Sequence, residues 1–466
     1  MSVPFSAADA ATWTGGELSG DAQQARFRGV SIDSRNVARG QLFIAIAGPN
    51  FDGHAFVAAA AARGAAGAVV ERKRTLAETP PAAFPLLQVD DTTRALGALA
   101  RGHRERFEGP LVAITGSNGK TTTKEMCAAI LSVSAPCLKN VGNLNNHFGL
   151  PLTLLGREEA QRSVVVEVGM NHRGEIAVLA EIAQPSVGVL TNVGTAHIEY
   201  LGTREEIALE KGDLVAALPA DGCAVLNGDD PHASAQGERT AARVLRFGQS
   251  PDSDVRPARV RSLEGRGFAF ELQWPEGRLD VEVAGLSDAT LANALAASAA
   301  ALAAGVKPAD IAAGLASYQP APGRLARRDL PGDRVVIDDT YNANPQSMEV
   351  ALRMLAQLDS KGRRLAVLGQ MGELGETAET AHRDAGALAA RLGIDFVFAL
   401  GERAEWIVAG ARDAGMEPER LHTGLEHAEI AARVRDVLRD GDAVLVKGSR
   451  AAQMERVVAA LVEGSD

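Results

Sequence analysis

One segment limits the possible folds of this chain more than any other, and it runs from Leu111 to Met126 as LVAITGSNGKTTTKEM. Its first residues, Leu111–Ile114, are all apolar, as expected of a buried parallel strand. A polar loop with two glycines follows, and after Lys120 the sequence favours a helix. Strand, glycine loop and helix in this order place backbone N–H groups and a helix N-terminus around a phosphate group.

We therefore expect the phosphates of a nucleotide to bind at this loop. Lys120 would neutralise the β- and γ-phosphates, and the Thr121 hydroxyl would bind Mg²⁺. Ile114 stands where the strict G-x-x-x-x-G-K-[ST] pattern has its first glycine, so an ordinary strand–helix turn is the alternative, which the strand–loop–helix context disfavours. The candidate nucleotide-binding residues of the loop are Thr115, Gly116, Ser117, Asn118, Gly119, Lys120, Thr121 and Thr122.

The composition argues against several other classes of protein. At 466 residues the chain is too long for one hydrophobic core, so more than one domain is expected. The net charge of −11 argues against a nucleic-acid-binding surface. The most apolar helix-like run, Leu291–Ala304, is too short for a membrane span, and the N-terminal residues lack the basic start of a signal peptide. Three cysteines without metal-ligand spacing suit a reducing cytoplasm.

The order of the expected elements predicts an α/β protein with three domains. Residues 1–90 are expected to form a small α/β unit, and residues 91–322 a central domain with a mostly parallel sheet. Within the central domain, the alternating pattern from Val255 to Val283 is typical of an antiparallel insertion. A Pro/Gly-rich linker, Tyr318–Arg324, leads into residues 323–466, whose strand–helix alternation favours a Rossmann-like sheet.

Polar residues gather where the expected central strands end, which is where open α/β sheets bind ligands. Glu167 ends a buried strand, and a carboxylate there is costly unless it is paired or binds a cation, so we expect it to bind Mg²⁺. His197 follows the strand Val187–Leu190. The stretch 140–149 holds more asparagines than a turn needs, which favours a ligand-facing loop.

Three further groups of residues leave alternatives open. Lys211 lies in a charged helical stretch, where a solvated lysine is the default interpretation. Asp33, Ser34 and Arg35 taken alone favour a plain turn, and the alternative is an anion contact through Arg35. Asn293 lies three residues after Thr290 and shares its helix face.

The motifs TGSNGKTTTKEM, GNLNNHFGLP, VVVEVGMNHRGEI, GTAHIEYLG, DDTYNANPQSM, MGELG and LVKGSR follow one another as in the Mur ligases, which this chain resembles over nearly its whole length. Among those ligases the likeness is greatest to the members that add a dipeptide. The resemblance implies a first domain that binds a UDP-sugar peptide, a second that binds ATP and a third that binds the incoming dipeptide. It also implies a reaction in which UDP-MurNAc-tripeptide, D-Ala-D-Ala and ATP give UDP-MurNAc-pentapeptide, ADP and phosphate.

The resemblance implies roles for individual residues as well. Lys120 would hold the γ-phosphate, Thr121 and Glu167 would bind one Mg²⁺, and His197 and a carbamylated Lys211 would form a second metal site. The implied nucleotide contacts are Asn293, Arg324, Asp339, Tyr341, Asn342 and Asn344. The implied substrate contacts are Ser34, Arg35, His54, Asn143, Asn145, Asn146, Lys447, Ser449 and Arg450.

The sequence departs from the family pattern at the start of one helix, where Ala289–Thr290 replaces His-Asn. Thr290 therefore stands in place of an asparagine that contacts adenine in the family, while Asn293 is retained. The alternatives are another amide-forming ligase of the superfamily, such as a Mur ligase that adds one amino acid or a folylpolyglutamate synthase, and a nucleotide-dependent switch without ligase activity. The expected protein is a cytoplasmic monomer with small-molecule substrates.

Overall fold

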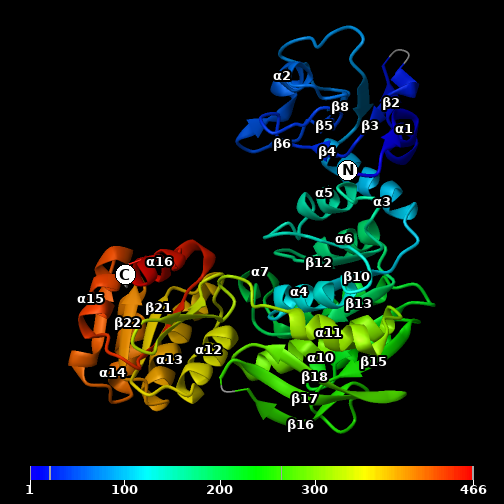
Figure 1. Ribbon diagram of the computed structural model, residues 1–466. Coiled ribbons are helices and arrows are strands. Elements are labelled where there is room, and N and C mark those ends of the chain that lie inside the picture. Colours follow the sequence, from blue (N-terminus) through cyan, green and yellow to red (C-terminus); the bar gives the residue numbers. More distant parts are fainter. Residues whose placement is uncertain (1, 20–21, 264, 464–466) are drawn as a thin grey trace.

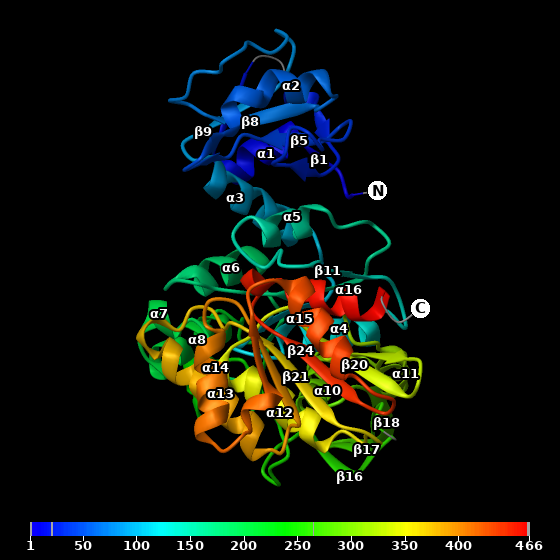
Figure 2. The ribbon, with the colours of Figure 1, turned by 90° about the vertical axis from the view of Figure 1, so that its left-hand side faces the viewer.

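The computed structural model describes residues 2–19, 22–263 and 265–463. Three bodies, each built on a sheet with helices, follow one another along the chain (Figure 1). The N-terminal body lies at one end of the molecule, and the C-terminal body lies beside the middle one. Figure 2, turned by a quarter, shows the C-terminal body in front of the middle body, with the N-terminal body above them and joined to the middle body through α3 (Thr92–Glu105) and α5 (Gly149–Leu155).

The N-terminal body has a small sheet of strand order β2-β9-β8-β5-β4, parallel except for β2. Its strands are β2 (Glu17–Leu18), β4 (Val30–Ser31), β5 (Leu42–Ile44), β8 (Gly67–Glu71) and β9 (Leu86–Val89). Two-residue pairs, β1 (Phe5–Ser6) with β3 (Arg26–Phe27) and β6 (Ala47–Gly48) with β7 (Phe51–Asp52), complete it. Its helices are α1 (Ala7–Thr14) and α2 (Val57–Ala62).

The middle body is a six-stranded, wholly parallel sheet of order β11-β12-β10-β13-β14-β15. Its strands are β10 (Leu111–Thr115), β11 (Cys137–Lys139), β12 (Ser163–Glu167), β13 (Val187–Leu190), β14 (Cys223–Asn227) and β15 (Arg243–Phe247). The strand β10 lies between β12 and β13, so the chain changes direction across the sheet there. Loops after these three strands meet at one carboxyl edge, which is where such sheets bind ligands.

Helices cover both faces of this sheet. The helices α5, α6 (Glu175–Ala183) and α8 (Arg204–Ala216) cover one face. The apolar cluster beneath them continues through α3 into the core of the N-terminal body. The other cluster lies under α4 (Lys120–Leu131), α10 (Asp288–Ala303) and α11 (Pro308–Ser317). The short helices α7 (Ile198–Leu201) and α9 (Pro231–Ser234) lie near the carboxyl edge. A separate three-stranded antiparallel sheet follows β15 in the chain. Its strands are β16 (Arg256–Ser262), β17 (Gly267–Trp274) and β18 (Gly277–Ala284).

The C-terminal body is a six-stranded sheet of order β19-β20-β24-β21-β22-β23, parallel except for β19. Its strands are β19 (Ala326–Leu330), β20 (Arg334–Asp339), β21 (Arg364–Gly369), β22 (Phe396–Leu400), β23 (Leu421–Gly424) and β24 (Ala443–Lys447). The helices α12 (Pro345–Gln357), α13 (Ala378–Arg391) and α14 (Ala404–Asp413) cover one face. The helices α15 (His427–Val437) and α16 (Glu455–Glu463) cover the other.

The α/β fold and the antiparallel insertion expected from the sequence are confirmed. The strand–helix alternation expected for the C-terminal body did not specify β19, β23 or α14. None of the described helices is long and apolar enough to cross a membrane. The boundaries 1–90, 91–322 and 323–466 stay a prediction.

Two glycines let α13 and α14 approach each other closely in the C-terminal body. A Cβ at Gly386 would lie 1.8 Å from the Ile407 carbonyl oxygen, and one at Gly410 would lie 1.9 Å from that of Arg383. Both obstacles are backbone atoms, so the helices would have to separate to admit a methyl group.

We therefore expect Gly386→Ala to lower the free energy of unfolding by about 2 kcal/mol, the usual cost of overpacking, despite the better helix propensity of Ala. The control is Gly97→Ala in α3, where the new Cβ would meet only the end of the Ile182 side chain at 2.9 Å. Thermal and denaturant unfolding measure the stability of the two variants. Equal stability of the two variants would contradict the backbone-contact explanation.

Candidate functional site

A cavity of about 1110 Å³ opens between the carboxyl edge of the middle sheet and the C-terminal body. Both bodies contribute polar side chains to its wall. From the middle body come Ser117 to Thr122, Asn143, Asn145, Asn146, Glu167, His197 and Asn293. From the linker and the C-terminal body come Arg324, Asp339, Tyr341, Asn342, Asn344, Lys447 and Arg450. Most of the residues predicted from the sequence to bind nucleotide or metal therefore face one space.

The phosphate loop is held in shape by the loop that follows β13. The Ser117 N–H donates to the Asn192 carbonyl at 2.9 Å, and the Asn118 N–H donates to Asn192 Oδ1 at 2.9 Å. In return, Thr191 Oγ1 donates to the Asn118 carbonyl at 2.6 Å. A Cβ at Gly116, whose φ is +147°, would lie 1.9 Å from Thr191 Oγ1. The glycine is thus required by this close approach of the two loops.

Lys120 bends back over the loop that precedes it. Its Nζ donates to the Gly116 carbonyl at 2.8 Å. Burial lowers the pKa of Lys120, while the nearby carboxylate of Glu167 raises it. Gly119, with a φ of +81°, begins α4, and a Cβ there would lie 2.3 Å from Asn293 Oδ1. The ammonium group and the N-terminus of α4 therefore point into the space where an anionic phosphate would be stabilised.

Thr121 and Glu167, the two residues expected to bind one Mg²⁺, lie side by side. The Thr121 hydroxyl donates to Glu167 Oε2 at 2.8 Å, and the Asn145 amide donates to Oε1 at 2.9 Å. Glu167 is only 4% exposed, although it lines the cavity. A carboxylate beside a hydroxyl offers the oxygen ligands that Mg²⁺ prefers. Among the described residues, no group of three or more His, Cys, Asp and Glu side chains could hold a metal by itself.

Lys211 is buried, so the default interpretation of a solvated helix lysine is wrong. It is 1% exposed within α8, and burial holds the pKa of its amine well below its usual range, assisted by the charge of Lys120. Nearby Glu210 and Glu167 act in the opposite direction on that pKa. The helix is charged along its sequence, but the face that carries Lys211 packs inward. This orientation could not be read from composition.

His197 meets the C-terminal body through a residue that the sequence analysis did not single out. Its Nδ1 lies 2.7 Å from Glu373 Oε2, a short ion-pair distance whose alignment is not that of a hydrogen bond. The contact with His197 lowers the pKa of the Glu373 carboxyl. His197 and Glu373 both have positive φ angles, +66° and +57°. Glu373 also lines the cavity, and its only sequence signal is the MGELG motif.

The linker and the C-terminal body touch the phosphate loop directly. Arg324 Nη2 donates to Thr121 Oγ1 at 2.8 Å, and its guanidinium group lies 3.9 Å from the centre of the Tyr341 ring. The Asn344 amide donates to Asn118 Oδ1 at 2.8 Å. The two hydrogen bonds join residues more than two hundred positions apart, so two nucleotide-contact candidates, Arg324 and Asn344, reach the loop together.

Lys447 and Asp339 form a buried pair at the ends of adjacent strands, β24 and β20. Lys447 is 2% exposed, and its Nζ donates to Asp339 Oδ2 at 2.6 Å and to the Asn342 carbonyl at 3.0 Å. Ser449 is buried with a hydroxyl that lacks a hydrogen-bond partner, whereas Arg450 pairs with Glu455 at 2.8 Å. The pair fixes the polar turn after β20 against the cavity.

The three N-terminal candidates do not join this cavity. Arg35 is exposed and forms a two-pronged ion pair with the Asp33 carboxylate, as in the plain-turn alternative. Ser34 lies in the same turn. His54 is 2% exposed, with Nδ1 2.6 Å from Asp52 Oδ1, and its Nε2 accepts the Glu71 N–H at 2.9 Å. Both ring nitrogens of His54 thus serve the N-terminal fold.

A buried network that sequence spacing did not reveal fixes Glu167. The Asn140 side chain accepts the Glu167 N–H at 2.9 Å and donates to the Glu167 carbonyl at 3.1 Å. Lys124, on α4, donates to the Asn140 carbonyl at 2.7 Å. Both Asn140 and Lys124 are 1% exposed. The asparagine-rich pattern indicated a polar loop, but it could not show which asparagine would face inward.

We expect Asn140→Ala to weaken Mg²⁺-dependent ATP binding by about tenfold, because outer residues that orient ligands commonly carry such effects. Lys124→Met, which keeps the side-chain volume but removes the bond to the Asn140 carbonyl, should act in the same direction. Calorimetric titration with ATP at several Mg²⁺ concentrations measures both, and thermal unfolding verifies that each variant is folded. Unchanged Mg²⁺ dependence in both folded variants would show that the network does not support the cation site.

Comparison with known proteins agrees with this arrangement. Three family models match: the Mur ligase family catalytic domain over residues 26–104, the Mur ligase middle domain over 114–301, and the Mur ligase glutamate ligase domain over 323–450. The UDP-N-acetylmuramoyl-tripeptide–D-alanyl-D-alanine ligase of Bacillus subtilis is 34% identical over 95% of this chain and 94% of that protein. A crystal structure of MurF from Acinetobacter baumannii has a TM-score of 0.89 at 33% identity and covers 99% of both chains. The MurF ligase of Thermotoga maritima in complex with ADP has a TM-score of 0.81 at 31% identity, over 93% of this chain and 97% of that one. The chain belongs to the Mur ligase family.

Proposed function

We propose that this chain joins D-Ala-D-Ala to UDP-MurNAc-tripeptide at the expense of ATP, giving UDP-MurNAc-pentapeptide, ADP and phosphate in the cytoplasmic stage of peptidoglycan synthesis. One observation carries the proposal most directly. A single cavity contains the phosphate loop, the Thr121–Glu167 pair and the polar ends of β20 and β24. The names of the relatives that match nearly the whole chain supply the substrates.

The chemistry explains why these groups must meet. A carboxylate is a poor electrophile, so transfer of the γ-phosphoryl group of ATP to the tripeptide carboxylate would first give an acyl phosphate. The amine of the dipeptide would then attack the acyl carbon, and phosphate would leave. Positioning and charge neutralisation supply most of the catalysis in phosphoryl transfer. In this scheme Lys120 leaves the Gly116 carbonyl to hold the γ-phosphate, and Arg324 and Asn344 bring the C-terminal body to the nucleotide.

The residues at the carboxyl edge fit Mg²⁺. Thr121 and Glu167 would hold one ion, which would neutralise charge on the phosphates. His197 and a carbamylated Lys211 would hold a second one. Carbamylation needs an uncharged amine, and burial favours that form because it lowers the pKa of Lys211 well below its usual range. The carbamate then offers the anionic oxygen that a hard cation prefers.

The remaining assignments complete the proposal. Residues 1–90, with Ser34 and Arg35, would bind the UDP end of the substrate, and His54 would shape that body from within. Residues 91–322 would bind ATP, with Asn293 and the substituted Thr290 near the base, and Asn143, Asn145 and Asn146 would face the peptide. Residues 323–466 would bind the dipeptide through Lys447, Ser449 and Arg450. The protein would act as a cytoplasmic monomer.

One prediction of the proposed function concerns the choice of acceptor. Phosphate release from ATP in the presence of UDP-MurNAc-tripeptide should be far faster with D-Ala-D-Ala than with any single amino acid. A panel containing L-glutamate, meso-diaminopimelate and L-lysine provides the comparison in a steady-state assay. Equal rates with a single amino acid would favour another amide ligase of the superfamily, and turnover independent of any amine would favour a nucleotide-dependent switch.

Another prediction of the proposed function concerns Lys211. Lys211→Ala should be nearly inactive, and a short carboxylic acid in the buffer should partly restore activity by taking the place of the carbamate. Lys120→Ala should be equally inactive but not restored, because the group that it loses is cationic. Isotope-labelled bicarbonate should give a carbamate NMR signal that Lys211→Ala lacks and that strengthens as pH rises through the lowered amine pKa. Full activity of Lys211→Ala at every Mg²⁺ concentration would exclude the role.

A further inference from the structure

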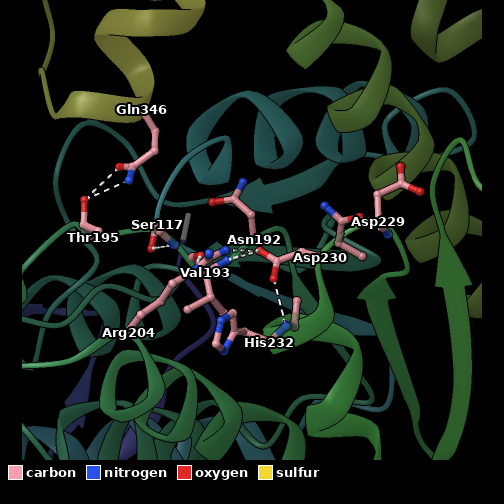
Figure 3. A network of polar contacts seen from close by, with 12 residues as sticks. Ser117, Asn192, Val193, Thr195, Arg204, Asp229, Asp230, His232 and Gln346 are labelled. Atoms are coloured by element: carbon pink, nitrogen blue, oxygen red, sulfur yellow. Dashed lines mark hydrogen bonds and ion pairs between the residues drawn. The ribbon is translucent and has the colours of Figure 1, made fainter. Parts of the chain in front are cut away.

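The loop that follows β13 contacts both the phosphate loop and the C-terminal body. Asn192 binds the phosphate loop, and the Gly194 N–H donates to Ser117 Oγ at 2.8 Å. Thr195 exchanges hydrogen bonds with Gln346 of α12 at 2.9 and 3.0 Å. His197 lies against Glu373. Figure 3 shows Thr195 and Gln346 facing each other across the two bodies, with Val193 and Ser117 below them. The position of this loop therefore sets both the phosphate loop and the contact with the C-terminal body.

Two charged side chains hold the peptide groups of Val193 from opposite sides. The Asp230 carboxylate accepts the Val193 N–H through Oδ2 at 2.7 Å. The Arg204 Nε donates to the Val193 carbonyl at 2.7 Å, and Arg204 Nη2 lies 3.6 Å from Asp230 Oδ2. In Figure 3 both side chains converge on Val193 from separate elements, α8 and the start of α9. We call Asp230 and Arg204 the Val193 clamp.

The two residues of the Val193 clamp are anchored to separate elements. Asp230 is 8% exposed, and its other oxygen, Oδ1, accepts the N–H groups of His232 at 3.0 Å and Ala233 at 3.3 Å. Arg204 begins α8, the helix that also carries Lys211. Hydrogen bonds in which one partner is ionised are stronger than neutral ones, and the carboxylate here is largely withdrawn from water. The clamp thus ties a single residue of the loop to the starts of α8 and α9.

We propose that Asp230 and Arg204 are positioning residues of the ligase reaction, which act through the loop after β13. They hold Val193 so that Gly194 supports Ser117 of the phosphate loop and Thr195 and His197 meet the C-terminal body. Loss of the clamp would leave the fold intact but would let this loop move away from the bound nucleotide. The expected loss of ligase activity rests on the proposed function. The expected loosening of the loop rests on the contacts alone.

The test compares Asp230→Asn with a matched control at the preceding residue. Asp229 is also a carboxylate that accepts backbone N–H groups, from Gln249 at 2.7 Å and Ser250 at 2.9 Å, but those belong to another loop. Asp230→Asn keeps the size and one oxygen, yet places an N–H₂ group or a weaker acceptor before Val193. Asp229→Asn should alter only the loop at 249–250. Arg204→Gln removes the other half of the clamp from a side chain that is 44% exposed, so it should fold even if Asp230→Asn does not.

Amide hydrogen exchange and kinetics are measured on each full-length variant. Asp230→Asn and Arg204→Gln should exchange the Val193 and Gly194 amides about tenfold faster than the unmodified chain, because a loop that is held less firmly opens more often. Both should lower kcat/KM for ATP by about tenfold and leave KM for UDP-MurNAc-tripeptide unchanged. The double variant should be no worse than the more impaired single one, because the two side chains contact each other and hold the same residue. Asp229→Asn should match the unmodified chain in each respect.

Two results would overturn the inference. One is normal exchange at Val193 and Gly194 in a folded Asp230→Asn or Arg204→Gln variant, which would show that the clamp does not hold the loop. The other is an equal kinetic loss in Asp229→Asn, which would reduce the effect to general destabilisation. Amide exchange does not require ligation. If the chain proved inactive with every acceptor, the proposed function would fail while the exchange measurement would still test the clamp.

Discussion

The hydrogen bonds between the phosphate loop and the loop after β13 are the constraint on which the rest of the site depends. Asn192 accepts from two successive N–H groups of the phosphate loop, and Thr191 and Gly116 are pressed together there. This pairing is possible because β13 lies directly beside β10 in the sheet. Because the phosphate loop is fixed in this way, Lys120 and the N-terminus of α4 are held at the wall of the cavity.

A comparable arrangement supports the opposing wall of the cavity. The Met371 N–H donates to His382 Nε2 at 2.9 Å, and Arg403 donates to the Met371 carbonyl at 3.0 Å. Met371 lies two residues before Glu373, which meets His197. The middle body and the C-terminal body therefore each bring to their shared boundary a loop in which both the N–H and the carbonyl of one residue are held, Val193 in the first and Met371 in the second. Preorganised polar groups of this kind cost little reorganisation when charge develops in a transition state.

The features that the sequence predicted correctly are those encoded by neighbouring residues. The strand–loop–helix pattern around Lys120 and the apolar strand ending at Glu167 follow from local spacing, and both lie where expected. The features that it missed depend on contacts between distant segments. Asn140 was indistinguishable from its neighbouring asparagines, and Lys211 appeared solvated because its helix is charged overall. The edge strands β19 and β23 lack the buried apolar runs of the central strands, so their sequences show no strand pattern.

The most direct measurement of the central claim is a crystal structure of this chain with a non-hydrolysable ATP analogue and Mg²⁺. The account predicts that Lys120 Nζ leaves the Gly116 carbonyl for the γ-phosphate, that Thr121 and Glu167 coordinate the cation, and that Asn192 keeps its bonds to the phosphate loop. A structure in which Lys120 stays on the Gly116 carbonyl while the phosphates bind elsewhere would contradict it.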